Sequence, residues 1–183
     1  MKPTKTDNHN LSAKLAVREA ILSEMKEGLD VADCFSGSET IWQSLGRKYP
    51  VKRYIALDVK PKRARLQLDC LRYLQAGGYS HNVIDLDAYG SPWECYEEAL
   101  KHFAGGAIFL TIGNVGMKRQ SIFALTSAGL PRETPVGMHA QLYKIIEELL
   151  LPLPLRHGFH FQKSVLHENK GGNAHYFGCL ISH

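Results

Sequence analysis

The chain is poor in the features that mark secreted, zinc-binding and membrane proteins. It has only 4 cysteines among 183 residues, far apart and without a CxxC pair, so neither a disulfide framework nor a zinc site is indicated. No stretch approaches the roughly 18 apolar residues of a membrane span, and residues 1–10 contain no apolar segment of a secretion signal. We therefore expect free thiols in a cytoplasmic protein that does not enter the membrane.

The sequence also lacks the glycine signature of dinucleotide-binding oxidoreductases. No GxGxxG occurs, which argues against a NAD-dependent enzyme. The 9 histidines form no HxxxH or HxH pattern with supporting acids, so we expect no metal site. No internal repeat or linker divides the chain. We expect residues 1–10 to form a disordered leader and residues 11–183 to form a single domain.

Basic residues are unevenly distributed. The formal net charge is +4, which permits a polyanionic partner but does not identify one. One quarter of the chain carries most of the clustered cations: Arg47, Lys48, Lys52, Arg53, Lys60, Lys62, Arg63, Arg65 and Arg72. Two interpretations remain open, a solvated basic face and a surface that contacts phosphates.

Hydrophobic runs alternate with helix-like segments along most of the chain. The expected strands are 29–35, 53–58, 65–69, 83–87, 107–112, 159–166 and 175–181. The expected helices are 10–27, 39–45, 70–76, 91–104, 117–128 and 138–151, the last stopped by Pro152 and Pro154. Asn10 would cap the first helix, Gly28 would end it, and we assign it a packing role only. The alternation predicts a mainly parallel α/β sheet with helices on its faces, finished by an antiparallel hairpin.

Four of these strands carry an acid at or near the carboxyl end: Asp33, Asp58, Asp69 and Asp87. Ligands of open α/β sheets bind outside this edge. The small residues 36–38 after Asp33 provide a tight turn where backbone N–H groups can approach a nucleotide-like ligand. Asp58 stands where an acid accepts hydrogen bonds from ribose hydroxyls, and Asp69 is placed to meet an adenine amine. Each acid alone could instead cap a helix or lie in a solvated turn, but three in this order ahead of Asp87 favour a ligand site.

Asp87 precedes a Gly/Pro turn and is the strongest candidate for chemistry. An exocyclic amine of a nucleobase is a poor nucleophile because its lone pair is delocalised into the ring. A carboxylate that accepts a hydrogen bond from this amine localises the lone pair. In a methyl transfer to the amine, the same carboxylate can take the amine proton as the methyl group is transferred. Tyr89 could stack on an extruded base. The structural alternative is that Asp87 and Ser91 cap the next helix while Tyr89 packs.

These segments resemble the catalytic core of the tRNA (guanine-N2)-dimethyltransferase family. Residues 84–92, Ile-Asp-Leu-Asp-Ala-Tyr-Gly-Ser-Pro, are similar to its IDxDPYGSP motif. Further segments resemble its first motif (33–38), its third motif (68–70), its fifth strand (106–111) and its closing strand (from His175). The resemblance covers residues 29–181. It implies a Rossmann-like class I S-adenosylmethionine-dependent methyltransferase with a seven-stranded sheet whose last strand is antiparallel.

The resemblance also implies roles for individual residues. Asp87 matches the acid proposed to act on the guanine amine, and S-adenosyl-L-methionine is the implied cofactor. The predicted catalytic residues are Asp87, Tyr89 and Gly90. The predicted cofactor-binding residues are Asp33, Phe35, Ser36, Gly37, Ser38, Asp58, Val59, Asp69 and Cys70. The predicted substrate-binding residues are Ser91, Pro92, Lys62 and Arg63, with RNA favoured over DNA as the partner.

The sequence departs from the family pattern at several places. Glu39 stands where a third small residue is expected, Ala88 replaces the proline, and only about seven residues connect the second and third strands. The family's additional RNA-binding domain has no counterpart in these residues. We therefore keep two alternatives: a DNA amino-methyltransferase, which typically carries (D/N/S)PP(Y/F) at this place, and a non-catalytic methyltransferase-fold binding protein.

Overall fold

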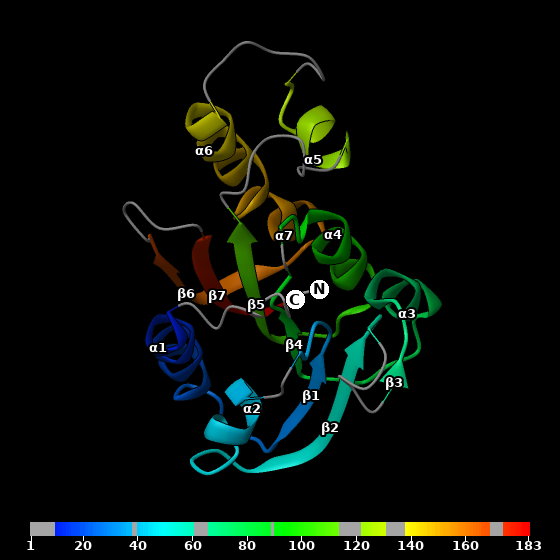
Figure 1. Cartoon of the computed structure of the whole chain (residues 1–183), viewed down its shortest axis with the longest axis vertical. Coiled ribbons are helices and arrows are strands. Elements are labelled where there is room, and N and C mark those ends of the chain that lie inside the picture. Colours follow the sequence, from blue (N-terminus) through cyan, green and yellow to red (C-terminus); the bar gives the residue numbers. More distant parts are fainter. Residues whose placement is uncertain are drawn as a thin grey trace, which may run out of the picture.

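The computed structural model describes residues 10–37, 40–60, 66–88, 90–113, 122–130, 138–168 and 174–183. Its strands form one seven-stranded sheet in the order β3-β2-β1-β4-β5-β7-β6 (Figure 1). The strands are β1 (Leu29–Asp33), β2 (Val51–Asp58), β3 (Leu66–Gln67), β4 (Val83–Leu86), β5 (Gly106–Gly113), β6 (His160–His167) and β7 (Ala174–Ser182). Only the pairs β5–β7 and β6–β7 are antiparallel. This confirms the predicted Rossmann-like sheet and its antiparallel C-terminal hairpin.

The central strands β1, β4 and β5 are buried on both faces. This explains why their sequences are mostly apolar rather than alternating. Every residue of β5 from Ala107 to Gly113 is buried. Along β7, side chains alternate between the two sides: Phe177 and Cys179 join one core, and Tyr176 and Leu180 join the other. The sheet is therefore the middle layer of three.

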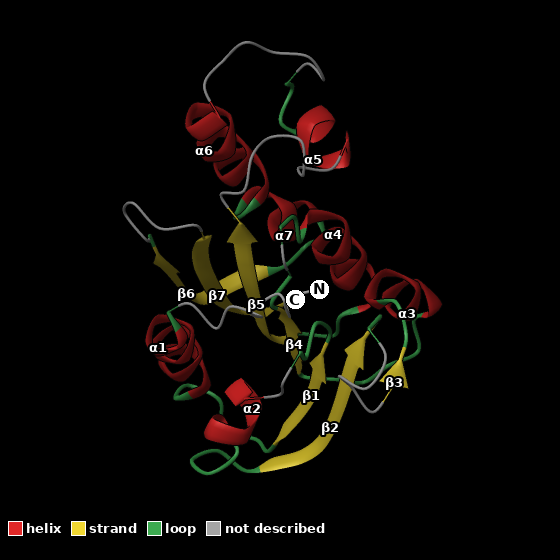
Figure 2. Ribbon diagram, in the orientation of Figure 1, coloured by secondary structure: helices red, strands yellow, loops and turns green. Residues whose placement is uncertain are grey.

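Helices cover both faces of the sheet (Figure 2). The smaller core lies under α1 (Leu11–Leu22) and α2 (Thr40–Leu45). The larger core lies under the remaining helices, which are α3 (Cys70–Ala76), α4 (Trp93–His102), α5 (Ile122–Ser127), α6 (Met138–Leu149) and α7 (Pro152–Arg156). Figure 1 shows α5 and α6 beyond the tip of β5, on the same side as the carboxyl ends of the parallel strands.

The predicted cap and the predicted end of the first helix are wrong. Asn10 has a left-handed backbone (φ 69°) and its side chain does not cap α1, which ends at Leu22 rather than near Gly28. The helix predicted over 138–151 is confirmed, since α6 ends at Leu149 just before Pro152, but Pro152 also opens α7, which the sequence did not predict. Proline is well tolerated in the first helical turn, where its missing N–H would have no intrahelical partner.

Several predictions lie outside the described residues. These are the leader over residues 1–9, most of the connection between β2 and β3 (61–65), the start of the helix expected from Met117, and the loop 169–173. Within the part of the chain that the structure describes, no helix is both long and apolar enough to cross a bilayer.

Candidate active site

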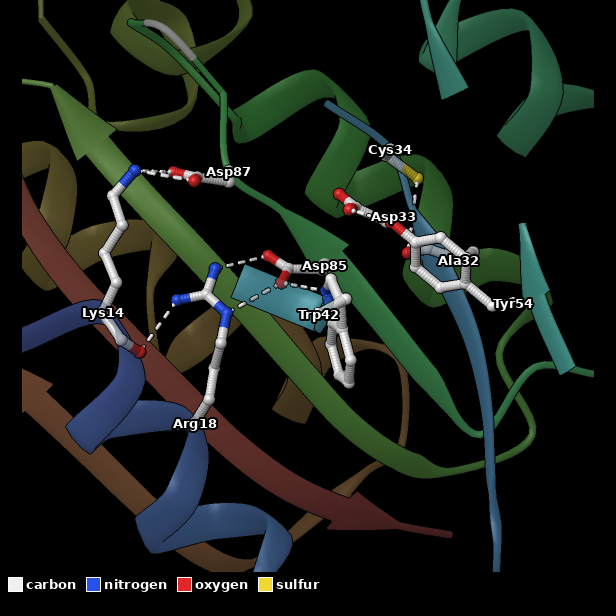
Figure 3. A network of polar contacts seen from close by, with 9 residues as sticks. All are labelled: Lys14, Arg18, Ala32, Asp33, Cys34, Trp42, Tyr54, Asp85 and Asp87. Carbon is white, nitrogen blue, oxygen red and sulfur yellow. Dashed lines mark hydrogen bonds and ion pairs between the residues drawn. The ribbon is translucent and has the colours of Figure 1, made fainter. Parts of the chain in front are cut away.

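The alternation of side chains along the strands places three acids on one face of the sheet. Asp33 ends β1, Asp85 lies in β4, and Asp87 follows β4 by one residue. Asp33 and Asp85 are register partners in the β1–β4 pair, and residues two apart on a strand point to the same side. All three face α1 and α2 rather than the larger core (Figure 3). Asp33 and Asp85 are only 4% and 1% exposed.

Asp87 is held by a lysine from the first helix. The Nζ atom of Lys14 donates to Asp87 Oδ1 at 2.7 Å and to Oδ2 at 2.6 Å. The two side chains are 8% and 13% exposed. The same ammonium lies 5.8 Å from the ring centroid of Tyr176 on β7. Lys14 therefore contacts both carboxylate oxygens of the predicted catalytic acid.

The surrounding charges keep Asp87 ionised. Burial acts to raise the pKa of this carboxyl group, but the positive charge of Lys14, followed by that of Arg18, outweighs it, so the pKa lies below its usual value. The Thr111 hydroxyl on β5 also favours the charged form, although it forms no regular hydrogen bond within the described residues. Asp87 is thus a carboxylate at neutral pH.

A second ion pair lies deeper on the same face. Arg18 donates through Nε to Asp85 Oδ2 at 2.8 Å and through Nη2 to Oδ1 at 2.6 Å. Trp42 on α2 donates its indole N–H to Asp85 Oδ2 at 2.8 Å. The remaining guanidinium nitrogen bonds the carbonyl of Lys14 at 3.0 Å. Asp85 therefore accepts three hydrogen bonds from α1 and α2, which suits a carboxylate that positions these two helices against the sheet.

Asp33 differs from the other two acids because its hydrogen-bond donor is neutral. The Tyr54 hydroxyl of β2 donates to Asp33 Oδ2 at 2.8 Å. Burial and, after it, the charge of Asp85 raise the pKa of Asp33 well above its usual value, against the opposing effect of the Tyr54 hydrogen bond. Among the described residues, the cluster thus contains three carboxyl groups but only two cations, Lys14 and Arg18, which pair with Asp87 and Asp85. The charge of Asp33 would be balanced by a proton or by a cationic ligand.

The turn after β1 is tied to both neighbouring strands. The Cys34 N–H donates to the Asp85 carbonyl at 2.9 Å, and the Ser36 N–H donates to the Leu57 carbonyl at 3.0 Å. Gly37 has φ +51°, and among the described residues a Cβ added there would come within 4 Å of the Phe35 carbonyl oxygen alone, at 3.8 Å. This sharp turn with free space beside it agrees with the geometry that the small residues predicted.

The other predicted cofactor residues lie at the same edge in different environments. Asp58 ends β2 and accepts from the Lys60 N–H at 2.8 Å, and Val59 is 56% exposed. Asp69 is exposed and caps α3 by accepting from the Arg72 N–H at 3.0 Å. The Asp69 side chain thus makes the helix cap that was its structural alternative, and its contact with adenine stays a prediction.

Cys70 is predicted to contact the cofactor, but its side chain is buried. It is 3% exposed and belongs to the larger core. Its thiol interacts with those of Cys34 and Cys95, and these interactions together with burial raise its pKa far above the usual value. Any contact from this residue to a ligand at the sheet edge would have to come from its backbone. All four cysteines are free and buried.

The turn after Asp87 is attached to the tip of β5. Gly90 has φ +119°, and its carbonyl accepts from the Gly113 N–H at 2.9 Å. A Cβ on Gly113 would lie 3.1 Å from Gly90 Cα, so the close approach favours glycine at position 113, whereas the positive φ favours glycine at position 90. The catalytic role predicted for Gly90 is untested, and the observed role is to shape this turn.

The capping alternative for this stretch is wrong. Pro92 occupies the N-cap position of α4 without a side-chain cap, and both oxygens of Asp87 bond Lys14. The Ser91 hydroxyl is buried and has no hydrogen-bond partner among the described residues. The substrate-binding role of Ser91 stays a prediction.

The basic residues clustered in sequence do not all share one place in the fold. Lys52 and Arg53 lie near the start of β2, whereas Lys60 follows its end, about 25 Å away at roughly 3.3 Å per residue. Lys48 pairs with Glu19, and Arg53 pairs with Asp30. Several residues named from the sequence lie outside the described residues: Ser38, Glu39, Lys62, Arg63, Arg65 and Tyr89.

Comparison with known proteins addresses the fold. No protein-family model matches the chain, and no curated protein matches it in sequence. Trm1 from Pyrococcus horikoshii, solved with S-adenosyl-L-methionine, matches with TM-score 0.63 at 12% identity over 94% of this chain and 54% of that one. This chain has the fold of the class I methyltransferases.

Two further solved structures extend the range of similar proteins. The magnesium protoporphyrin IX methyltransferase ChlM from Synechocystis PCC 6803, with bound SAH, matches with TM-score 0.55 at 12% identity over 94% of this chain and 82% of that one. A candidate hemolysin from Streptococcus thermophilus matches with TM-score 0.62 at 13% identity over 100% of this chain and 69% of that one. Identities this low leave the substrate open.

The first helix is the part of the site that the sequence interpretation missed. We assigned it a packing role, yet its buried face carries Lys14 and Arg18 beside Val17 and Ile21. Residues four apart on a helix lie on the same face. Two cations on the apolar face of an amphipathic helix were the available signal, because buried charges need partners.

Proposed function

We propose that this protein is an S-adenosylmethionine-dependent methyltransferase that acts on an exocyclic amine of a nucleic-acid base, with guanine N2 in tRNA or another RNA as the favoured acceptor. The observation that carries the proposal is the Asp87 carboxylate. Its side chain is ionised and 13% exposed, and it follows β4 at the carboxyl edge of a class I methyltransferase sheet.

The residues at this edge fit the proposed cofactor chemically. S-adenosylmethionine has a cationic sulfonium centre, an amino group and two ribose hydroxyls. Asp33 is a carboxyl group with a neutral partner, so a cationic ligand would complete the local charge balance. Asp58 offers its second carboxylate oxygen at the end of β2, and Gly37 leaves space for close approach. Solved methyltransferases of this fold contain bound SAM or SAH, which supports the same assignment.

The chain's own contribution to the reaction would be proton management and orientation. Bound S-adenosylmethionine would supply the electrophilic methyl group and leave as S-adenosylhomocysteine. Asp87 would accept a hydrogen bond from the acceptor amine, which directs the lone pair toward the methyl group, and would then take the amine proton. The buried Ser91 hydroxyl could orient the base next to it.

The substrate part of the proposal rests on the motif at residues 84–92 and on the cationic residues at the same edge. Lys60 is exposed there, and Lys62 and Arg63 follow it in sequence. A DNA amino-methyltransferase is the alternative with the same chemistry, and the Asp-Ala-Tyr-Gly sequence at 87–90 disfavours it. The similar proteins of known structure include a plantazolicin methyltransferase and a magnesium protoporphyrin IX methyltransferase, so the acceptor must be determined by assay.

One observation favours a non-catalytic function. Asp87 is engaged by Lys14 at both oxygens, as a purely structural carboxylate would be. Calorimetric titration with S-adenosylmethionine separates the two functions. Binding in the micromolar range is expected for the enzyme, and absence of binding at high micromolar concentration would leave only the non-catalytic function.

A further inference from the structure

The Lys14 ammonium lies where an acceptor amine would have to be activated. Both are nitrogen groups that donate hydrogen bonds to the Asp87 carboxylate, and Lys14 already contacts both carboxylate oxygens, at 2.7 and 2.6 Å. An amine that approaches Asp87 must therefore share or displace this contact. The Lys14–Asp87 ion pair is an obstacle to the proposed reaction unless it has a role in it.

The chemistry supplies such a role. A carboxyl group buried without a countercharge tends to hold its proton, and a protonated Asp87 could not accept the proton of an amine. The positive charge of Lys14, the nearest one to Asp87, prevents this protonation. Lys14 stands on a four-carbon stem, and its ammonium also lies above the Tyr176 ring, 5.8 Å from the centroid. A flexible lysine can move from the carboxylate toward this ring more readily than the bidentate Arg18 can leave Asp85.

We propose that Lys14 is a positioning residue: it keeps Asp87 ionised in the empty site and gives up its contact with the carboxylate when the acceptor amine arrives. This inference rests on the proposed function and deepens it, because it adds a residue from the first helix to the proton-transfer step. The groups that face Asp87 from the elements packed against it are Lys14 and Arg18 on α1, Asp33 on β1, Asp85 on β4, Thr111 on β5 and Tyr176 on β7.

The direct test is the titration of Asp87 itself. Carboxyl ¹³C NMR, with the signal assigned by its absence in Asp87→Asn, should show Asp87 titrating at higher pH in Lys14→Gln than in the wild type. The expected shift is about 1–3 pH units, the range for removal of an opposite charge at this distance. Glutamine keeps a hydrogen-bond donor, so the variant isolates the charge. Lys14→Arg, which keeps the charge, should titrate close to the wild type.

Lys48→Met is the matched control. Lys48 forms an ion pair with Glu19 of α1, the helix that carries Lys14. The Lys48 side chain is 58% exposed. This variant should leave the Asp87 titration unchanged. An unchanged Asp87 titration in Lys14→Gln would overturn the proposal. If Lys14→Gln does not fold, lysine-selective NMR of the wild type still decides: the Lys14 ammonium signal must move as Asp87 titrates, and a signal that does not move contradicts the pairing.

Kinetics test the second half of the proposal. With unmodified tRNA transcripts, the acid limb of the pH profile of kcat/KM should move to higher pH in Lys14→Gln. At pH values above that limb, KM for the transcript should fall several-fold, because no ammonium group competes with the acceptor amine for Asp87. An unchanged limb and KM would contradict a role in catalysis. Should the wild type transfer no methyl group to RNA or DNA, the proposed function fails, while the NMR titrations still report whether Lys14 controls Asp87.

Discussion

Arg18 and Asp85 form a two-pronged ion pair between the first helix and the fourth strand, across 67 residues of sequence. Both side chains are almost fully buried, at 2% and 1% exposed. The pair fixes α1 over the carboxyl edge of the sheet and thereby determines where Lys14, one turn earlier, reaches Asp87. Its first effect is therefore on the geometry of the site rather than on the chemistry.

Replacing one partner of this pair should strongly destabilise the protein. Arg18→Met leaves the Asp85 carboxylate buried without a countercharge, for which a loss of about 3–5 kcal/mol in the free energy of unfolding is expected. Urea unfolding of the purified variant measures this loss. Lys48→Met, which breaks the exposed ion pair between Lys48 and Glu19 of α1, should cost less than about 1 kcal/mol. Equal losses in the two variants would show that Arg18–Asp85 is not a buried pair.

Asp33 makes the stability of the protein depend on pH with a defined sign. The pKa of Asp33 is raised in the folded state by burial and by the charge of Asp85. Its contribution to stability is therefore complete below its unfolded pKa and is lost as the pH rises through the folded pKa. Asp33→Asn keeps an acceptor for the Tyr54 hydroxyl but cannot ionise.

The Asp33→Asn variant should accordingly gain thermal stability relative to the wild type as the pH rises. Between about pH 5 and pH 9, the melting temperature of Asp33→Asn should rise relative to that of the wild type. The difference should be about 2–4 °C for each kcal/mol of relative stabilisation in a chain of this size. The same variant should bind S-adenosylmethionine more weakly in calorimetry, because the carboxylate that balances the cationic ligand is gone. A wild type whose stability rises relative to Asp33→Asn at alkaline pH would contradict the charge balance described for this cluster.

The sequence predicted the sheet and the positions of Asp33 and Asp87 because these depend on local signals. The alternation of strand-like and helix-like segments, the strand ends and the Gly/Pro turn are properties of short stretches of sequence. Parallel strands then bring their carboxyl ends to one edge of the sheet. Asp85 and Trp42 were assigned no role, since their partner Arg18 lies far away in sequence and the pairing exists only once α1 packs on the sheet. The helix opened by Pro152 was missed because proline was interpreted only as a helix breaker.

The two groups of basic residues should differ in their effect on RNA binding. Lys62→Ala with Arg63→Ala is expected to weaken binding of tRNA transcripts and to reduce the salt slope by about one unit for each phosphate that is no longer neutralised. Arg47→Ala with Lys52→Ala removes the same charge near the opposite end of β2 and should change neither quantity appreciably. Equal slopes for both double variants and the wild type would assign all four residues to a solvated face.

Asp87 is the residue that we propose performs the chemistry of a methyltransferase. The most direct measurement is transfer of radiolabelled methyl groups from S-adenosylmethionine to unmodified tRNA transcripts, bulk RNA and DNA, by the wild type and by Asp87→Asn. Glu98→Gln, which alters an exposed ion pair with Lys101 on α4, is the control for general effects of charge removal. We expect transfer to RNA by the wild type and by Glu98→Gln. Asp87→Asn should lose about 100-fold or more in rate while still binding the cofactor. Full activity of Asp87→Asn would contradict this proposal.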